Sequence, residues 1–202
     1  MILEYKTIFG RAEGFYKEKG SKFYGYALPI KRESDIKAIL DKLKEEHPKA
    51  RHHCFAFRFG TDGNNFRAND DGEPSGTAGR PILGQIDSFG LLNVLVVVVR
   101  YFGGTLLGAS GLIRSYRAGA FEALSAAKIV EEKVQSRFQI NFKYPVMNQV
   151  MKRLKAENVN FINQRFELDC EVIVEVETRK EMALKESLRN VEALEIKRIG
   201  KG

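Results

Sequence analysis

The chain has 202 residues, 44% of them hydrophobic and 29% charged, which is typical of a soluble globular protein with one large domain or two small ones. Its apolar runs are shorter than the roughly 20 residues that cross a bilayer, and its first residues do not resemble a signal peptide, so we expect a cytoplasmic protein without membrane contact. The formal net charge of +7 favours an acidic partner such as nucleic acid or the ribosome, with surface solubility as the alternative explanation of the charge. Two cysteines far apart in the sequence exclude a disulfide framework.

Hydrophobic periodicity and turn residues predict the elements of the first part of the chain. In order, they are strands at 3–9 and 22–30, a helix from Ser34 to just before Pro48, strands at 52–59 and 65–69, a short helix at 80–88, a strand at 94–99 and a longer helix at 110–128. Ser34 is expected to cap the first of these helices. The strand at 94–99 consists of six consecutive apolar residues, which indicates burial on both of its faces.

After about residue 130 the pattern starts again, with the order β-α-β-β-α-β of a ferredoxin-like unit. The elements are strands at 134–142, 159–166, 169–177 and 194–199, a helix opened by Pro145 and a helix at 179–189. Along 169–177, glutamates alternate with apolar residues, which predicts a sheet with one face in water. We therefore expect an α+β fold with two domains, at 1–130 and 134–202, each with its helices on one face of a sheet.

The loop at 70–81 combines acidic, small, hydroxyl and basic residues. Its chemistry-bearing side chains are those of Asp70, Asp71, Glu73, Ser75, Thr77 and Arg80. Carboxylate oxygens suit a hard cation such as Mg²⁺, although two adjacent aspartates cannot by themselves complete such a site. The half that ends in Arg80 could instead cradle a phosphate at the start of the next helix. The alternative is a tight structural loop, in which Thr77 caps the helix and the acids lie in water.

A second candidate site follows the strand at 94–99. It consists of Arg100, Gly103, Gly104, Ser110, Arg114 and Arg117. The glycines would let a phosphate or another backbone approach, Ser110 could cap the next helix, and Arg114 and Arg117 share one face of that helix. In the alternative, Arg100 pairs with an acid of the preceding loop and the glycines only allow tight packing. The glycine spacing matches no nucleotide-binding motif.

The Arg-His-His-Cys segment that precedes these loops offers both imidazoles and a thiol. On a strand, His52 and Cys54 point to one face and His53 to the other. A zinc site needs three or four convergent ligands, and the remaining candidates, His47 and Cys170, belong to the preceding helix and to the other domain. We therefore expect no metal, no cofactor and a buried structural Cys54, with a Cys54–His52 nucleophile pair as the alternative.

Three separated motifs, in this order along the chain, resemble those of the YigZ/IMPACT family. They are Arg51-His52-His53-Cys54, the run Asp70-Asp71-Gly72-Glu73-Pro74-Ser75-Gly76-Thr77-Ala78-Gly79-Arg80-Pro81, and Val97-Val98-Val99-Arg100-Tyr101-Phe102-Gly103-Gly104 with Leu107-Gly108. All three lie in the first domain. The second domain resembles the small C-terminal domain of the family in its element order and length.

The resemblance implies a first domain of the ribosomal-protein type, similar to domain IV of elongation factor G, and a ferredoxin-like second domain similar to the last domain of that factor. Eukaryotic relatives are tied to the regulation of translation under amino-acid starvation. They bind their partner partly through an extra N-terminal domain, for which we expect no room in this chain, so that partner is not carried over. Some bacterial members carry a dipeptidase label, which no metal-ligand set in these residues supports.

Together these observations favour a cytosolic, non-catalytic module that binds RNA or a ribosomal surface and modulates translation. The residues expected to bind phosphate are Ser75, Thr77, Arg80, Arg100, Gly103, Gly104, Ser110, Arg114 and Arg117. The alternative is an enzyme that acts on a small phosphorylated or carboxylated ligand in a cleft between loops 70–80 and 100–111. Its cleft residues would be His52, His53, Asp70, Asp71 and Glu73. In a third reading, the second domain docks a protein partner.

Overall fold

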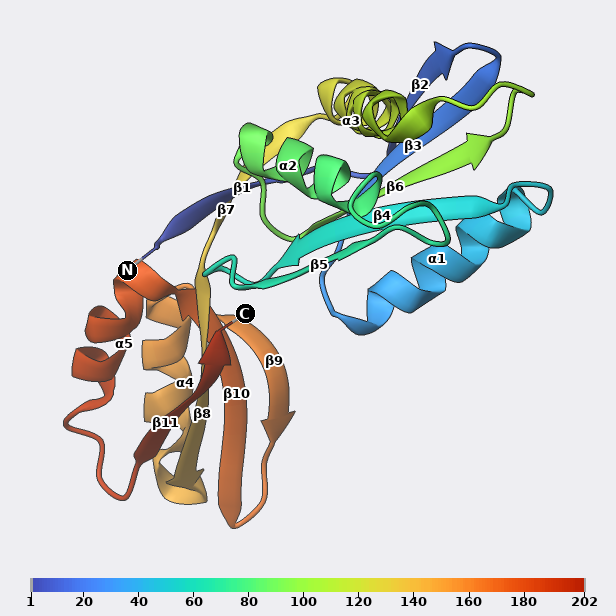
Figure 1. Ribbon diagram of the computed structural model, residues 1–202. Coiled ribbons are helices and arrows are strands. Elements are labelled where there is room, and N and C mark those ends of the chain that lie inside the picture. The colour runs from blue at the N-terminus through green and yellow to red at the C-terminus, as the bar shows by residue number, and fades with distance from the viewer. Residues whose placement is uncertain (1, 202) are drawn as a thin grey trace. The chain divides into compact units, whose positions relative to one another are not determined.

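A computed structural model describes residues 2–201, which form two units. The N-terminal unit comprises Tyr5–Glu132, and the C-terminal unit comprises the chain from Lys133 onward together with the first few residues. Strand β1 (Glu4–Ile8) pairs with β7 (Ile129–Lys133) in a two-stranded sheet (Figure 1). The stretch at which the sequence pattern restarts is therefore itself a strand.

An antiparallel sheet of five strands, in the order β2-β3-β6-β4-β5, forms the centre of the N-terminal unit. The strands are β2 (Ala12–Glu18), β3 (Ser21–Pro29), β4 (His52–Phe59), β5 (Asn65–Asn69) and β6 (Val94–Tyr101). The sequence predicts all of them except β2. This strand lies at an edge of the sheet, and its residues are exposed and half-buried in alternation, so it lacks the apolar signal of a core strand.

Helices cover both faces of this sheet, which corrects the expectation of helices on one face only. Figure 1 shows α1 (Ser34–Glu46) on one side and α2 (Gly79–Phe89) with α3 (Gly108–Ser125) on the other. Alternate residues of β6 pack into two separate cores, with Val94, Val96 and Val98 facing α2 and α3, and Leu95, Val97 and Val99 facing α1. The continuous apolar run of β6 follows from this double burial, although the sheet is antiparallel.

The three hydroxyl residues expected to cap helices, Ser34, Thr77 and Ser110, do not cap them. Helix α1 already begins at Ser34, and α2 follows Ala78. Helix α3 follows Leu107, so Ser110 lies inside its first turn. None of these helices has a side-chain hydrogen bond at its N-cap. Sequence alone places such caps poorly because helix ends shift by one or two residues with the local turn geometry.

Helix α3 lies close against β2 and β3 because two glycines face it. Gly14 and Gly25 are direct partners in the β2–β3 ladder. A Cβ atom added at Gly14 would overlap the backbone of Glu122 and Ala123, and one added at Gly25 would overlap the carbonyl oxygen of Gly119. The two glycines therefore set how closely the helix approaches the sheet.

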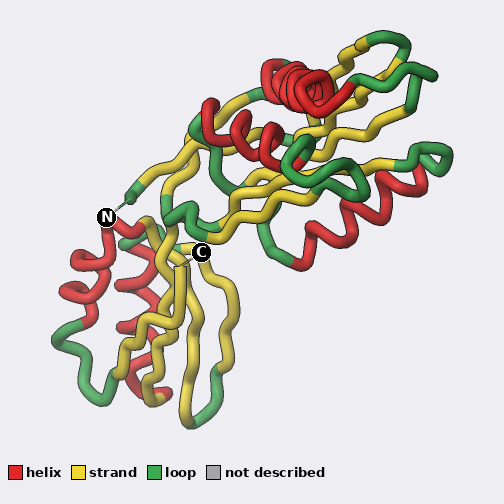
Figure 2. Tube along the Cα trace, in the orientation of Figure 1, coloured by secondary structure: helices red, strands yellow, loops and turns green. Residues whose placement is uncertain are grey.

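The C-terminal unit has its helices on one face of a four-stranded antiparallel sheet (Figure 2). Its elements are β8 (Gln135–Lys143), α4 (Met147–Ala156), β9 (Asn160–Arg165), β10 (Asp169–Glu177), α5 (Glu181–Leu188) and β11 (Glu195–Lys201), and the strand order is β11-β8-β10-β9. The alternation predicted for β10 is confirmed, because Cys170, Val172, Val174 and Val176 are buried, whereas Glu175 on the other face forms an ion pair of 2.5 Å with Arg137. No helix among residues 2–201 is both long and apolar enough to cross a membrane.

Candidate functional site

The register of the five-stranded sheet places Arg100 between two residues that the site depends on. Arg100 stands opposite Phe23 on β3 and opposite His52 on β4. Directly opposed residues of an antiparallel pair point to the same face, so all three side chains point to the face that α2 and α3 cover. Arg100 is the last fully buried residue of β6, at the point where the sheet gives way to the loop toward α3.

Arg100 forms a buried ion pair with Glu73. The Nη1 atom of Arg100 lies 2.6 Å from Oε1 of Glu73, and the two side chains are 7% and 4% exposed. The hydroxyl of Tyr116, on α3, donates to the same oxygen over 2.7 Å. Pairing with an acid of the 70–73 loop is one of the two arrangements that the sequence leaves open for Arg100, and Glu73 is the partner. The charge of Arg100 is thereby compensated inside the protein.

Sequence reasoning does not find Tyr116 as part of this network. The ring of Tyr116 is fully buried and packs edge-on against Phe23 at a centroid distance of 5.2 Å. A buried phenolic hydroxyl needs a hydrogen-bond partner, and this requirement is the one signal that points toward a nearby acid.

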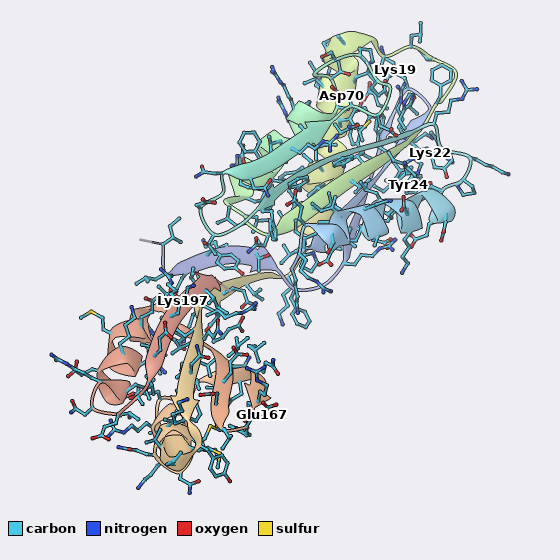
Figure 3. All side chains as sticks on the ribbon, turned by 90° about the horizontal axis from the view of Figure 1, so that it is seen from below. Lys19, Lys22, Tyr24, Asp70, Glu167 and Lys197 are labelled. Atoms are coloured by element: carbon cyan, nitrogen blue, oxygen red, sulfur yellow. The ribbon has the colours of Figure 1, made fainter. Side chains whose placement is uncertain are left out.

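The two aspartates that precede Glu73 are held by backbone and histidine groups. The carboxylate of Asp70, labelled in Figure 3, accepts hydrogen bonds of 2.8–3.0 Å from the backbone N–H groups of Gly76, Ala78 and Gly79. Burial opposes its ionisation, but these three donors lower the pKa of Asp70 below its ordinary value. Asp70 therefore stabilises the loop and the start of α2 as a structural acid.

Asp71 holds the two histidines of β4. Its carboxylate accepts the backbone N–H of His53 over 2.7 Å, and its carbonyl oxygen lies 2.9 Å from Nδ1 of His52. His53 is buried on the α1 side of the sheet, and burial lowers the pKa of its imidazole. Of the two histidines, only His52 lies on the same face as Glu73, with its Nε2 atom 4.0 Å from the Glu73 carboxylate.

The thiol of Cys54 is fully buried and its Sγ atom donates to the carbonyl oxygen of Asp70 over 2.9 Å. Burial raises the pKa of this thiol well above its ordinary value, so the reactive thiolate is not formed near neutral pH. Cys170, in the C-terminal unit, is 2% exposed.

We expect both thiols to be inert in the native protein, because neither sulfur is accessible. Mass spectrometry after treatment with iodoacetamide at neutral pH should show unmodified native protein and two modified cysteines after unfolding in urea. Rapid alkylation of Cys54 in the native state, at a rate close to that of the unfolded chain, would contradict the structural role of this residue.

The loop from Phe102 to Leu107 is fixed by the turn between β2 and β3. The backbone N–H of Gly103 donates to the hydroxyl of Ser21 over 3.1 Å, and a Cβ atom added at Gly103 would overlap the backbone of Gly20. Gly104 has a φ of +87°, which favours glycine. These glycines thus serve close backbone packing and a tight turn in the structure.

Five of the candidate residues line two separate pockets of the N-terminal unit, namely His52, Glu73 and Arg100 in one, and Arg80 and Arg117 in the other. The first, here called the large pocket, has a volume of about 880 Å³ and is lined by Lys49, Arg51, His52, Glu73, Pro74 and residues between Arg100 and Leu112. It lies where the sequence places a cleft between the 70–80 and 100–111 loops. The second, the Arg80 pocket, has a volume of about 420 Å³.

The Arg80 pocket brings together two of the expected phosphate-binding residues, Arg80 at the start of α2 and Arg117 on α3. Both are exposed, and no acidic residue is among those that line this pocket. Arg114, one turn earlier on α3, is exposed but does not line it, and Ser75 and Thr77 do not line it either. Arg100 lies in the other pocket, so the four arginines do not converge on one groove.

No group of three or more His, Cys, Asp or Glu side chains in the described part of the chain is placed to hold a metal ion. The ring nitrogens of His47, for instance, lie 2.6 Å from the hydroxyl of Tyr26 and 2.9 Å from that of Tyr101. His47 thus belongs to an aromatic cluster with Tyr24, which Figure 3 labels beside α1.

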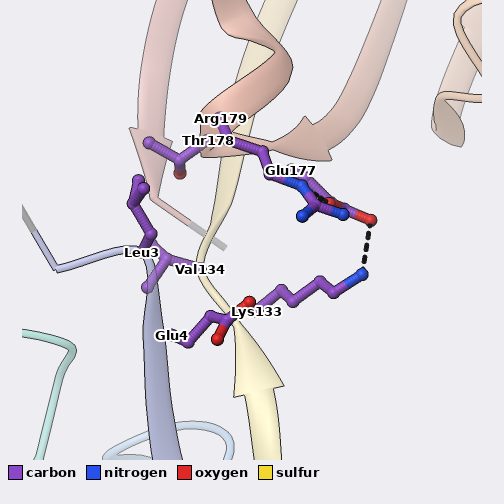
Figure 4. Close-up of a pocket in the computed structure, with 7 residues that line it drawn as sticks. All are labelled: Leu3, Glu4, Lys133, Val134, Glu177, Thr178 and Arg179. Carbon is purple, nitrogen blue, oxygen red and sulfur yellow. Dashed lines mark hydrogen bonds and ion pairs between the residues drawn. The ribbon is translucent and has the colours of Figure 1, made fainter.

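A further pocket, of about 340 Å³, lies within the C-terminal unit (Figure 4). The backbone N–H of Val134 donates to the carbonyl oxygen of Leu3 over 2.8 Å at this place. Glu177 pairs with Lys133 at 3.2 Å and with Arg179 at 2.5 Å, and these hydrogen bonds lower the pKa of its carboxyl. None of the residues expected to bind a ligand lines this pocket.

Comparisons with known proteins cover the same region. The profile of the family described as Impact N-terminal domain matches residues 19–124, a range that includes both the large pocket and the Arg80 pocket. A protein of Haemophilus influenzae described as an IMPACT family member is 36% identical over 161 residues, which is 77% of either chain. The IMPACT family member YigZ of Escherichia coli is 47% identical over 90 residues, or 44% of either chain.

One solved structure, described as that of a hypothetical protein, is similar to this chain over 99% of both molecules. Its TM-score is 0.82 and its sequence identity is 26%. Both units of the present chain are thus found in a solved relative.

Proposed function

Since the chain belongs to the IMPACT family, we propose that it is a non-catalytic module that binds RNA or the RNA surface of the ribosome and thereby modulates translation. The expected action of the family on translation motivates the proposal. We also propose that the protein is cytoplasmic, because translation takes place there. One structural observation carries it. Arg80, Arg114 and Arg117 are exposed on α2 and α3, and none of them forms an ion pair with another described residue.

Exposed arginines that have no ion-pair partner and lie on two neighbouring helices can bind the phosphate backbone of a nucleic acid. A guanidinium group binds phosphate oxygens through two parallel hydrogen bonds, and binding requires no desolvation of an internal partner when the arginine is unpaired. Asp87, the acid of α2, is already paired with Arg58 at 2.7 Å. We therefore assign the RNA contacts to the layer of α2 and α3, and Arg100 takes no part in them because Glu73 already neutralises it.

The folds of both units support the same proposal. The sheet order β11-β8-β10-β9 of the C-terminal unit, built from a β-α-β-β-α-β succession, is that of a ferredoxin-like unit. We propose that this unit and the N-terminal unit correspond to the last domain and to domain IV of elongation factor G, as the resemblance to the family implies. Domains of that kind would present an arginine-bearing surface to ribosomal RNA.

Removal of the charges of Arg80 and Arg117 should weaken RNA binding. We expect the double variant Arg80→Gln/Arg117→Gln to bind ribosomes or a structured RNA about tenfold more weakly at about 0.1 M salt, because two phosphate contacts are lost. The slope of log Kd against log salt concentration should fall by about 2. Filter binding or fluorescence anisotropy over a series of salt concentrations measures both quantities.

The matched control is Lys37→Gln/Lys42→Gln, which removes the same charge from exposed positions on α1, the helix on the opposite face of the sheet. This variant should keep at least half of the wild-type affinity. Equal losses in both variants would mean that net charge alone drives the binding, and no binding by the wild type at low salt would end the proposal.

A further inference from the structure

We infer that the large pocket binds a single nucleotide, with the phosphate held by Lys49 and Arg51 and the base on the ring of Phe102. The pocket and the Arg80 pocket share no lining residue, so this site is separate from the surface assigned to RNA. Its volume of about 880 Å³ lies in the range of small-molecule sites. Three properties of its walls determine which ligand fits: cations without an ion-pair partner, an exposed aromatic ring and two polar side chains.

The first property is an excess of positive charge. Lys49 and Arg51, on the segment that leads into β4, are both exposed and form no ion pair with any residue from 2 to 201. Glu73 is the only carboxylate among the described residues that line the pocket, and it already forms an ion pair with Arg100. The pocket thus presents two exposed cations that lack an ion-pair partner, and a ligand with an anionic group such as a phosphate could bind both.

The second property is an exposed aromatic and aliphatic lip. The side chain of Phe102 is 58% exposed and that of Leu106 is 85% exposed. The guanidinium carbon of Arg100 lies 5.7 Å from the centroid of the Phe102 ring. Among the described residues, no other aromatic ring packs against the ring of Phe102. A nucleobase stacks on such a ring whatever its identity, because every base has a flat π-face.

The third property is a pair of polar side chains, those of Arg100 and His52, among the residues that line the pocket. Arg100 is more than nine-tenths buried, and its Nε–H has no hydrogen-bond partner in the described structure. The carbonyl oxygen of Asp71 can only accept, so Nδ1 of His52 donates to it, and Nε2 of the same ring lies 4.0 Å from the Glu73 carboxylate. The edge of a base, which has both donors and acceptors, is compatible with such a polar wall.

The test uses the full chain and three small probes measured by isothermal titration calorimetry. Adenosine 5′-monophosphate should bind with a Kd below about 1 mM at low salt, which corresponds to about −4 kcal/mol. Ribose 5-phosphate, which lacks the base, and adenosine, which lacks the phosphate, should each bind at least tenfold more weakly. Equal binding of adenosine and its monophosphate would overturn the phosphate assignment, and no binding of the monophosphate would overturn the whole inference.

Two pairs of variants locate the site. Phe102→Ala should lower the affinity for adenosine 5′-monophosphate about tenfold, because alanine removes the ring on which the base stacks. Phe102→Tyr keeps an aromatic ring and should keep the affinity. Arg51→Gln should lower it about tenfold, whereas Arg117→Gln, in the Arg80 pocket, should leave it unchanged. Phe102 and Arg51 are exposed, so both variants are expected to fold. If Arg117→Gln lowered the affinity for adenosine 5′-monophosphate and Arg51→Gln did not, the nucleotide would bind outside the large pocket, and the inference would be wrong.

The nucleotide could be a free metabolite or an unpaired residue of an RNA, and competition separates the two sources. If a single-stranded RNA displaces the monophosphate from wild type and from Arg80→Gln/Arg117→Gln alike, the pocket takes a nucleotide of RNA. If RNA does not displace it, the pocket takes the free nucleotide. Binding of the monophosphate without any binding of RNA would refute the proposed function and leave this inference standing.

Discussion

Replacement of Glu73 by alanine is expected to destabilise the N-terminal unit by about 3–5 kcal/mol, the usual cost of leaving one member of a buried ion pair without its partner. Arg100 is only 7% exposed and would lose its counter-charge, and the hydroxyl of Tyr116 would lose its acceptor at the same time. Hydrogen exchange at the backbone amides of Val96 and Val98 measures the effect in this unit alone, because these amides belong to its central strand.

Two further variants show whether charge is the cause. Glu73→Gln keeps an acceptor for the Tyr116 hydroxyl but removes the negative charge, so we expect a smaller destabilisation. Glu73→Ala/Arg100→Met removes both charges and should be more stable than Glu73→Ala alone. If the double variant were less stable than the single one, the uncompensated charge of Arg100 would not be the source of the effect.

Replacement of Gly25 by alanine is expected to destabilise the N-terminal unit by about 3 kcal/mol, the upper part of the usual range for overpacking. The added Cβ would overlap the carbonyl oxygen of Gly119 in the backbone of α3, which no change of side-chain rotamer can relieve. Helix α3 would therefore have to move away from β3. Urea denaturation followed by the exchange of core amides measures the change in the free energy of unfolding.

Gly84→Ala is the matched control for Gly25→Ala. Gly84 is exposed on α2, and a Cβ added there meets no atom within 4 Å. Because alanine is favoured over glycine inside a helix, this variant should be more stable than wild type by about 0.5–1 kcal/mol. A mild effect of Gly25→Ala, similar in size to that of Gly84→Ala, would show that α3 has room to shift.

The sequence predicts those elements whose residue pattern is local. The apolar run of β6 and the alternation in β10 each determine a strand and its burial without reference to the rest of the chain. Strand β2 is missed because its position at the sheet edge leaves no apolar pattern. The sequence also does not predict that helices cover both faces of the five-stranded sheet. Periodicity shows which side of a helix is buried, but it does not show which face of the sheet that helix covers.

The candidate site depends on long-range pairing that the sequence does not encode locally. The sequence narrows the partner of Arg100 to the acids of one loop, but only the register of β3, β6 and β4 and the path of the loop select Glu73. The same holds for the separation of Arg80 from Arg100, which lie in different pockets although both were expected to hold phosphate. Exposed residues such as Phe102 carry no periodic signal, so their role follows from the pocket alone.

The pairing of β1 with β7 means that the chain enters and leaves the N-terminal unit through adjacent strands. In terms of connectivity, the N-terminal unit is an insertion, and the C-terminal unit is discontinuous, with Leu3 bonded to Val134 across the insertion. A fragment that starts at Lys133 would therefore lack part of its own fold. To separate the two units without dividing either of them, residues 5–132 would be excised as one fragment, and the cut ends of the C-terminal unit would be joined by a short linker.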